Sequence, residues 1–302
     1  MQIVDVKEDR NNLVKKHNEL IKAKGALSPT AQKMLSMIIA MIRVDDTEFQ
    51  RYALSIASYK KEIESKSKKS KRDFIEQAKE LMSNPFELEN GNIFNWCSNI
   101  STKELNGYII FEIHSKLKPL LLELKKETGN FTKYQLVNVL HLRGIYSPRL
   151  YEYFLMQYGQ RKYGTSSYQF DLKIDDLKEL LKIKKGYRYN NIKDRILEKA
   201  KTDFKKYTDI QFTYAEQKIG RKVDRLIITI KPNAKKIDKK IVSANDYPIE
   251  VMALKGTPNF SNDDDFIIAY DDGSFQLKKA NGSYVYFKSL KQFTYMLHNE
   301  EF

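Results

Sequence analysis

A short stretch in the second half of the chain concentrates side chains that can read the edges of nucleic-acid bases. Its sequence is GYRYNNIKDR, from Gly186 to Arg195. Asn can form a bidentate pair with adenine, and Arg can form one with guanine. Ile192 and Ile196 recur at helical spacing, which predicts a helix that turns these two side chains inward. We therefore expect this stretch to form the N-terminal end of a helix that enters the major groove of DNA.

The candidate DNA contacts of this helix are its polar residues, namely Tyr187, Arg188, Tyr189, Asn190, Asn191, Lys193, Asp194 and Arg195. The tyrosines can contact phosphates or thymine methyl groups. Asn191 and Arg195 are four residues apart, so their side chains are predicted to project together toward neighbouring base pairs. The alternative interpretation is an ordinary polar helix face.

Two further basic stretches can contact the phosphate backbone. KIGRKVDR (Lys218–Arg225) fits the tip of a β-hairpin, where Arg221 and Lys222 are expected to touch the backbone or the minor groove. KSKKSKR precedes a predicted helix and supplies four candidate phosphate contacts, which are Lys68, Lys69, Lys71 and Arg72. A solvated turn is the alternative for the first stretch, and a flexible solvated loop for the second.

The charge distribution favours a polyanionic partner for most of the chain. The chain has 302 residues, with 53 Lys and Arg against 39 Asp and Glu and a formal net charge of +14. Ala234–Phe302 holds 9 Lys and 10 acidic residues, which leaves 44 basic and 29 acidic residues in the part before it. A basic surface of that size attracts nucleic acid. Lysines that only maintain solubility are the alternative.

The familiar sequence patterns of enzymes and metal sites are absent. No G-x-x-x-x-G-K-[ST], C-x-x-C or H-E-x-x-H motif occurs. The four histidines stand alone, without the His-hydrophobe-His pair that rolling-circle initiators use to hold a metal for nicking. No Glu follows Asp263–Asp265 at calcium-loop spacing, so a solvated acidic turn is expected there. We expect no enzymatic activity, no catalytic residue, no metal and no cofactor.

The same patterns predict a cytoplasmic protein with no membrane partner. The single cysteine, Cys97, fits a reducing compartment and is expected to be a small buried residue. The N-terminal sequence MQIVDVKEDR has no apolar core of a signal peptide. Met34–Ile42, the longest apolar stretch, is interrupted by Ser36 and is far shorter than the ~20 residues of a membrane span.

The periodicity of apolar residues predicts the same order of elements twice. In the first half, Ser28-Pro29 begins a helix, and a strand, further helices and a hairpin with a type I′ turn at Asn90-Gly91 follow. In the second half, Ser147-Pro148 repeats the helix start, with Ser147 as the expected cap. A strand, helices and a hairpin that turns near Gly220 follow it. Helices followed by a hairpin, twice, predict tandem winged helix-turn-helix domains of the α+β class.

The last part of the chain is predicted to be a small β-rich extension. Pro232–Asn245 is polar and Lys-rich, which indicates a linker. Asp272-Gly273 and Asn281-Gly282 are hairpin turn signals. The predicted elements beyond the linker are strands at Phe266–Tyr270, Phe275–Lys279 and Tyr284–Phe287 and a short helix at Leu290–Leu297.

Several stretches carry a resemblance to a known family. They are Asn12–Ile21 followed by Leu27-Ser28, GYIIFEIHSKLKPLL (Gly107–Leu121), FTKYQL and SPRLYEYFLMQY within Phe131–Tyr158, and Ile174–Ile183, Tyr187–Leu197 and Asp209–Ile230 with GRKVDRLIITI. Ser147, Arg149, Leu150 and Tyr151 form the core of the third stretch. Together the stretches resemble the iteron-binding replication initiators of theta-replicating plasmids, the RepE and RepA type with two winged-helix domains. The resemblance covers about residues 10–233.

The resemblance implies a division of roles along the chain. Residues 1–128 are expected to form a winged-helix domain for dimerisation and phosphate contacts, and residues 129–233 a second one for DNA recognition. Residues 234–302 lie beyond the family's common core, and their role is open. Such proteins bind repeated origin sites as monomers, repress their own promoter as dimers and recruit host helicase-loading proteins.

The expected function is therefore initiation of plasmid replication by binding directly repeated double-stranded origin sites. A sequence-specific transcriptional repressor or phage regulator without initiator activity is the alternative. The residues by themselves indicate DNA binding, and only the resemblance indicates replication.

Overall fold

The computed structural model describes residues 2–3, 13–43, 46–62, 70–125, 130–162, 165–183, 186–233, 240–241, 267–269, 275–281 and 284–287. Their contacts divide the chain into two units. The first comprises residues 1–161 and 166–233, and the second comprises residues 162–165 and 234–302. None of the helices in these ranges is long and apolar enough to cross a membrane.

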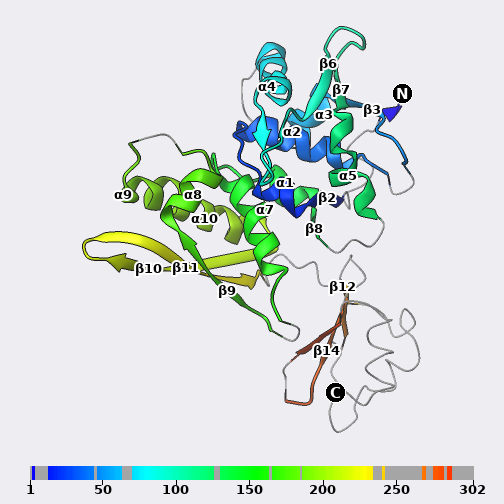
Figure 1. Cartoon of the computed structure of the whole chain (residues 1–302). Coiled ribbons are helices and arrows are strands. Elements are labelled where there is room, and N and C mark those ends of the chain that lie inside the picture. The colour runs from blue at the N-terminus through cyan, green and yellow to red at the C-terminus, as the bar shows by residue number, and fades with distance from the viewer. Residues whose placement is uncertain are drawn as a thin grey trace. The chain divides into compact units, whose positions relative to one another are not determined.

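The first winged helix in unit 1 follows the predicted order of elements (Figure 1). Its sheet has the strand order β1-β3-β7-β6, in which β1 is parallel to β3 and the other pairs are antiparallel. The elements are β1 (Gln2–Ile3), α2 (Pro29–Ala40), β3 (Arg51–Ser55), α3 (Ile56–Glu62), α4 (Lys71–Ser83), β6 (Cys97–Ser101) and β7 (Tyr108–Ile113). Cys97 is buried in β6, as predicted, and this burial raises the pKa of its thiol to about 12.

The second winged helix repeats this arrangement. Its sheet has the order β10-β11-β9, the same as β6-β7-β3 in the first. This winged helix follows α7 (Ser147–Tyr158), and its elements are β9 (Tyr168–Lys173), α8 (Ile174–Leu180), α9 (Tyr189–Ile192), a π-turn (Lys193–Leu197), α10 (Glu198–Tyr207), β10 (Ile210–Ile219) and β11 (Lys222–Pro232). The predicted α+β class with tandem winged helices is confirmed, and by sheet position α4 corresponds to the α9–α10 helix.

Short elements join the two halves of unit 1. The strand β2 (Leu13–His17) pairs antiparallel with β8 (Phe131–Gln135). One hydrophobic core cluster runs from Val14 to Ile230. The other connecting elements are α1 (Asn18–Lys22), α5 (Lys118–Leu121), α6 (Leu136–Leu140) and two 3₁₀ turns, Ser115–Leu117 and Glu123–Lys125. The β2–β8 pair bridges the boundary expected after residue 128, so the division into residues 1–128 and 129–233 stays a prediction.

Helix starts follow the predicted chemistry in one case and depart from it in another. Ser28 caps α2 by accepting a hydrogen bond from the Ala31 amide, and Pro29 is the first residue of the helix. By contrast, α7 already includes Ser147, and Tyr146 is its N-cap residue. The Ser147 hydroxyl is buried and has no partner among the described residues. The prediction that Ser147 caps this helix is therefore wrong.

The Asn90-Gly91 hairpin is present, but its turn differs from the prediction. The strands β4 (Phe86–Glu87) and β5 (Ile93–Phe94) pair antiparallel around it. A type I′ turn needs positive φ at both central residues. Only Gly91 has it, at 82°, and the Gly91 amide donates to the Leu88 carbonyl. The connection is longer than two residues, so a single left-handed glycine is enough to close it.

Unit 2 contains a four-stranded antiparallel sheet in the order β12-β13-β14-β15. The strands β13 (Ile267–Ala269), β14 (Phe275–Lys278) and β15 (Tyr284–Phe287) lie where the sequence predicts them. The fourth strand, β12 (Lys240–Ile241), lies inside the stretch that was predicted to be only a linker. That prediction is wrong at these two residues because they pair with β13. The helix expected at Leu290–Leu297 lies outside the described residues.

Candidate nucleic-acid interface

The helix expected to read bases runs without a break from α9 through the π-turn into α10. Ile192 and Ile196 are buried, as predicted. The π-turn at Lys193–Leu197 is not predicted by the sequence pattern, which favours a regular helix. A π-turn accommodates one additional residue in the helix, and it brings Leu197 into the core beside Ile196.

The N-terminal end of this helix presents most of the candidate contacts to solvent. Arg188, Asn190, Asp194 and Arg195 are exposed, whereas Asn191 is half-buried. Gly186 has a φ of +93°, so a left-handed residue turns the chain just before the helix begins. Within the described part of the chain, the side chains of these four exposed residues and of Asn191 form no hydrogen bond.

Three other candidates are less exposed. Tyr187 is half-buried and packs against the hydrophobic core. Lys193 directs its ammonium group to β10, with 2.8 Å between its Nζ and the Oε1 of Glu216. The Glu216 carboxylate raises the pKa of Lys193 and also lies beside Tyr189. Burial, followed by the influence of Glu216, raises the pKa of Tyr189. The side chains of Lys193 and Tyr189 thus lie between the α9–α10 helix, to which they belong, and the β10–β11 hairpin.

The β10–β11 hairpin places the second candidate group at an exposed tip. Ile219 pairs with Lys222, and Gly220 between them has a φ of +60°. Among the tip residues only this glycine needs the left-handed region, which is typical of a type II′ turn. Arg221 and Lys222 are exposed and have no ion pair with any described residue. Figure 1 shows this tip and α9 at the same end of unit 1.

The third candidate group lies in the first winged helix. Lys71 and Arg72 are exposed in the first turn of α4. Ser70 and Asp73 form a capping box that satisfies the backbone there. Lys68 and Lys69 lie outside the described residues. By its place in the fold α4 is the counterpart of the α9–α10 helix, so Lys71 and Arg72 lie at the start of the equivalent helix of the first winged helix.

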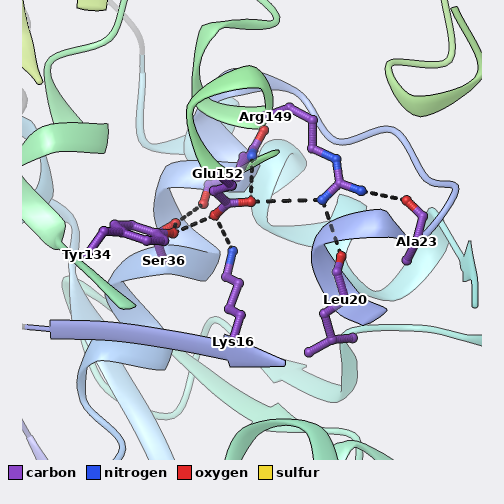
Figure 2. A network of polar contacts seen from close by, with 8 residues as sticks. Lys16, Leu20, Ala23, Ser36, Tyr134, Arg149 and Glu152 are labelled. Carbon is purple, nitrogen blue, oxygen red and sulfur yellow. Dashed lines mark hydrogen bonds and ion pairs between the residues drawn. The ribbon is translucent and has the colours of Figure 1, made fainter. Parts of the chain in front are cut away.

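A buried polar network supports this scaffold, and the sequence pattern did not indicate it (Figure 2). Glu152 in α7 accepts hydrogen bonds from Lys16 in β2, at 2.5 Å, and from the Tyr134 hydroxyl in β8. Burial favours the neutral acid, but Lys16 and Arg149 outweigh it and hold the pKa of Glu152 below its ordinary value. Burial also lowers the pKa of Lys16. The network fixes α7 against the paired strands.

The Ser-x-Arg-Leu-Tyr core extends this connection in two directions. Arg149 donates to the carbonyls of Leu20 at 3.3 Å and Ala23 at 2.5 Å, and so caps the C-terminal end of α1. The Tyr151 hydroxyl donates to Asp209 at 2.8 Å, just before β10. Through α7, Arg149 and Tyr151 therefore link α1 to the residue that precedes β10. Their spacing along the chain alone gave no sign of this role.

The α9–α10 helix is also tied to the loop before α7. Asp203 in α10 is buried, and its Oδ2 accepts hydrogen bonds from the backbone amides of Arg143 at 3.0 Å and Gly144 at 2.7 Å. Among the described residues no group of three or more His, Cys, Asp or Glu side chains is placed to hold a metal ion.

Comparison with known proteins agrees with this architecture. Residues 13–155 match the family model described as Initiator Replication protein, WH1, and residues 173–230 match Initiator Rep protein, WH2. A replication initiation protein of Escherichia coli is 26% identical over 158 residues, which are 50% of this chain and 47% of that protein. The match thus spans about half of the relative's length.

A solved structure shares the fold. The crystal structure of Pi initiator protein in complex with iteron DNA matches with a TM-score of 0.51 and 21% identity. The match covers 74% of this chain and 98% of that chain. With both winged-helix models matched in the expected order, the chain belongs to the family of initiator replication proteins that are built from the domains WH1 and WH2.

Proposed function

We propose that the protein initiates plasmid replication by binding directly repeated double-stranded DNA sites at an origin. The observation that carries the proposal is the set of exposed side chains at the start of the α9–α10 helix, Arg188, Asn190 and Arg195, at the same end of unit 1 as the basic hairpin tip. The helix is suited to base edges in the major groove and the tip to phosphates. Both lie on a scaffold whose family is that of replication initiators.

The proposal assigns different roles to the parts of the chain. The second winged helix reads the sequence, and the first supplies phosphate contacts through Lys71 and Arg72 together with Lys68 and Lys69. It also offers a surface for homodimerisation, and the dimer represses the gene's own promoter. The protein acts in the cytoplasm without catalysis of its own and recruits host helicase-loading proteins.

Plasmid maintenance tests the proposal against its alternative. The gene and its adjacent DNA are joined to a selectable marker without another origin, and transformants are counted. An initiator is expected to sustain the plasmid, and deletion of the repeats next to the gene is expected to abolish maintenance. A repressor or phage regulator binds the same DNA but yields no transformants. Cleavage of the origin DNA by the purified protein with magnesium contradicts the non-enzymatic role.

Binding is expected to weaken steeply with salt because each neutralised phosphate releases counterions. The logarithm of the binding constant falls by about 0.9 per contact for each unit of log salt. Replacement of Lys222 with Ala is expected to reduce this slope by about 1, equally on repeat and random DNA. Titrations between about 50 and 200 mM salt measure it.

Lys231 provides the matched control for this prediction. It is exposed on the same strand, β11, nine residues from Lys222 and so about 30 Å along the strand from the tip. The Lys231→Ala variant is expected to keep the wild-type slope. A slope that both substitutions reduce equally speaks against a specific role of the tip, and an affinity that barely changes with salt speaks against a phosphate-rich interface.

A further inference from the structure

The π-turn in the recognition helix is bounded by two residues whose side chains both contact the same strand. The Glu198 amide donates to the Lys193 carbonyl, which is the hydrogen bond that closes the π-turn. Lys193 pairs with Glu216 at 2.8 Å, and Glu198 accepts a hydrogen bond from the Tyr214 hydroxyl at 2.6 Å. The two residues that close the turn are thus each held by β10.

The geometry of β10 makes these two contacts a matched pair. Tyr214 and Glu216 are two residues apart in a strand, so their side chains lie on the same face of the hairpin. Lys193 lowers the pKa of Glu216, and burial together with Glu198 raises the pKa of Tyr214. At neutral pH Glu216 is therefore ionised and can pair with Lys193, and the Tyr214 hydroxyl keeps the proton that it donates to Glu198.

Asp194 and Arg195 lie between the two contacts and are exposed. A regular α-helix advances by about 100° per residue, so removing the extra residue of a π-turn rotates the helix on one side of it by about that angle relative to the other. Such a rotation moves Asn190, Asp194 and Arg195 around the helix axis relative to α10, which packs against β10. The π-turn therefore decides which way these candidate base contacts point.

We propose that the Lys193–Glu216 and Tyr214–Glu198 contacts are positioning contacts that stabilise the π-turn against a regular α-helix. They thereby determine which bases Asp194 and Arg195 contact. This inference rests on the proposed DNA binding and names the residues that set its specificity. Lys193, a candidate DNA contact from the sequence, then acts through Glu216 rather than on DNA. The hairpin and the recognition helix work as one rigid reading unit.

The test compares binding to the repeat with binding to random DNA of equal length for Glu216→Gln, Tyr214→Phe and the double variant. Each single change is expected to lower the ratio of specific to random affinity about tenfold, while random binding stays the same or rises slightly. The pairs are partly exposed, and exposed pairs contribute little to stability, so the variants are expected to stay folded. Circular dichroism and thermal melting verify this.

Asp171→Asn is the matched control. It removes one negative charge from the neighbouring strand β9 and breaks its 3.4 Å ion pair with Arg225, which lies in β11 and not in the helix. This variant is expected to keep the wild-type ratio. The charge swap that combines Lys193→Glu with Glu216→Lys is expected to recover most of the ratio that Lys193→Glu alone loses.

Hydrogen exchange of the amides at residues 193–198 provides a readout that does not depend on DNA. Faster exchange there in the double variant, but not in Asp171→Asn, supports the positioning role. A double variant that keeps both the wild-type ratio within twofold and the wild-type exchange overturns it. If the wild-type protein does not distinguish the repeat from random DNA, the proposed function fails, and the claim about specificity fails with it.

Discussion

The Glu152→Ala variant is expected to lose about 3–5 kcal/mol of unfolding free energy, because the change leaves buried cations without their counterion. Lys16 is 2% exposed and Glu152 1%, and Arg149 lies within 3.8 Å of the same carboxylate. Small domains are stable by only about 5–15 kcal/mol, so this is a large share of the total. Urea denaturation monitored by circular dichroism measures the loss.

Glu76→Ala is the control for this prediction. Glu76 forms an exposed pair with Lys79 on α4, and such pairs contribute about 0–1 kcal/mol. Because Glu152 is buried and Glu76 is exposed, we do not expect the two variants to lose similar amounts of unfolding free energy. A loss below about 1 kcal/mol in Glu152→Ala contradicts the view that the network holds α7 against the strands.

Replacement of Asn191 or Arg195 with Ala is expected to weaken binding to the repeat by about 1–3 kcal/mol in each case, with little change on random DNA. The reason is that bidentate contacts to base edges carry sequence information, whereas phosphate contacts do not. Quantitative shift assays on both DNAs measure the difference. Thermal melting of each variant confirms that it is folded.

Thr202→Ala is the control on the same helix. Thr202 is exposed in α10, and its hydroxyl donates to the Glu198 carbonyl within the helix. We expect this variant to bind both DNAs as the wild type does. Equal losses on repeat and random DNA for Asn191→Ala and Arg195→Ala place base reading elsewhere, and the next residues to test are Arg188–Asn190, one turn earlier.

The sequence alone determined the elements whose signals are local. The spacing of Ile192 and Ile196 predicted the buried side of the recognition helix, and both are buried. Ser28 and Gly220 predicted a helix start and a hairpin turn because capping and positive φ depend on a few neighbouring residues. The repeated order of such elements was enough to predict two winged helices.

Tertiary structure decided the features that join distant parts of the chain. Lys16 and Glu152 are 136 residues apart, and in the sequence each is indistinguishable from an ordinary surface charge. Only the folded structure shows that they are buried in contact with each other. Asn90 kept a negative φ because the length of its loop, and not the Asn-Gly pair, set the turn. The strand at Lys240–Ile241 exists through its pairing with β13.

The candidate site shows the same division. Residue types predicted which side chains can contact DNA, and the structure places Arg188, Asn190, Asp194, Arg195, Arg221 and Lys222 in solvent. The π-turn that orients part of this set was not predictable. The spacing of apolar residues indicates a regular helix and contains no information about contacts with a distant strand. The turn is held by Glu216 and Tyr214, which reach the helix only after β10 has packed against it.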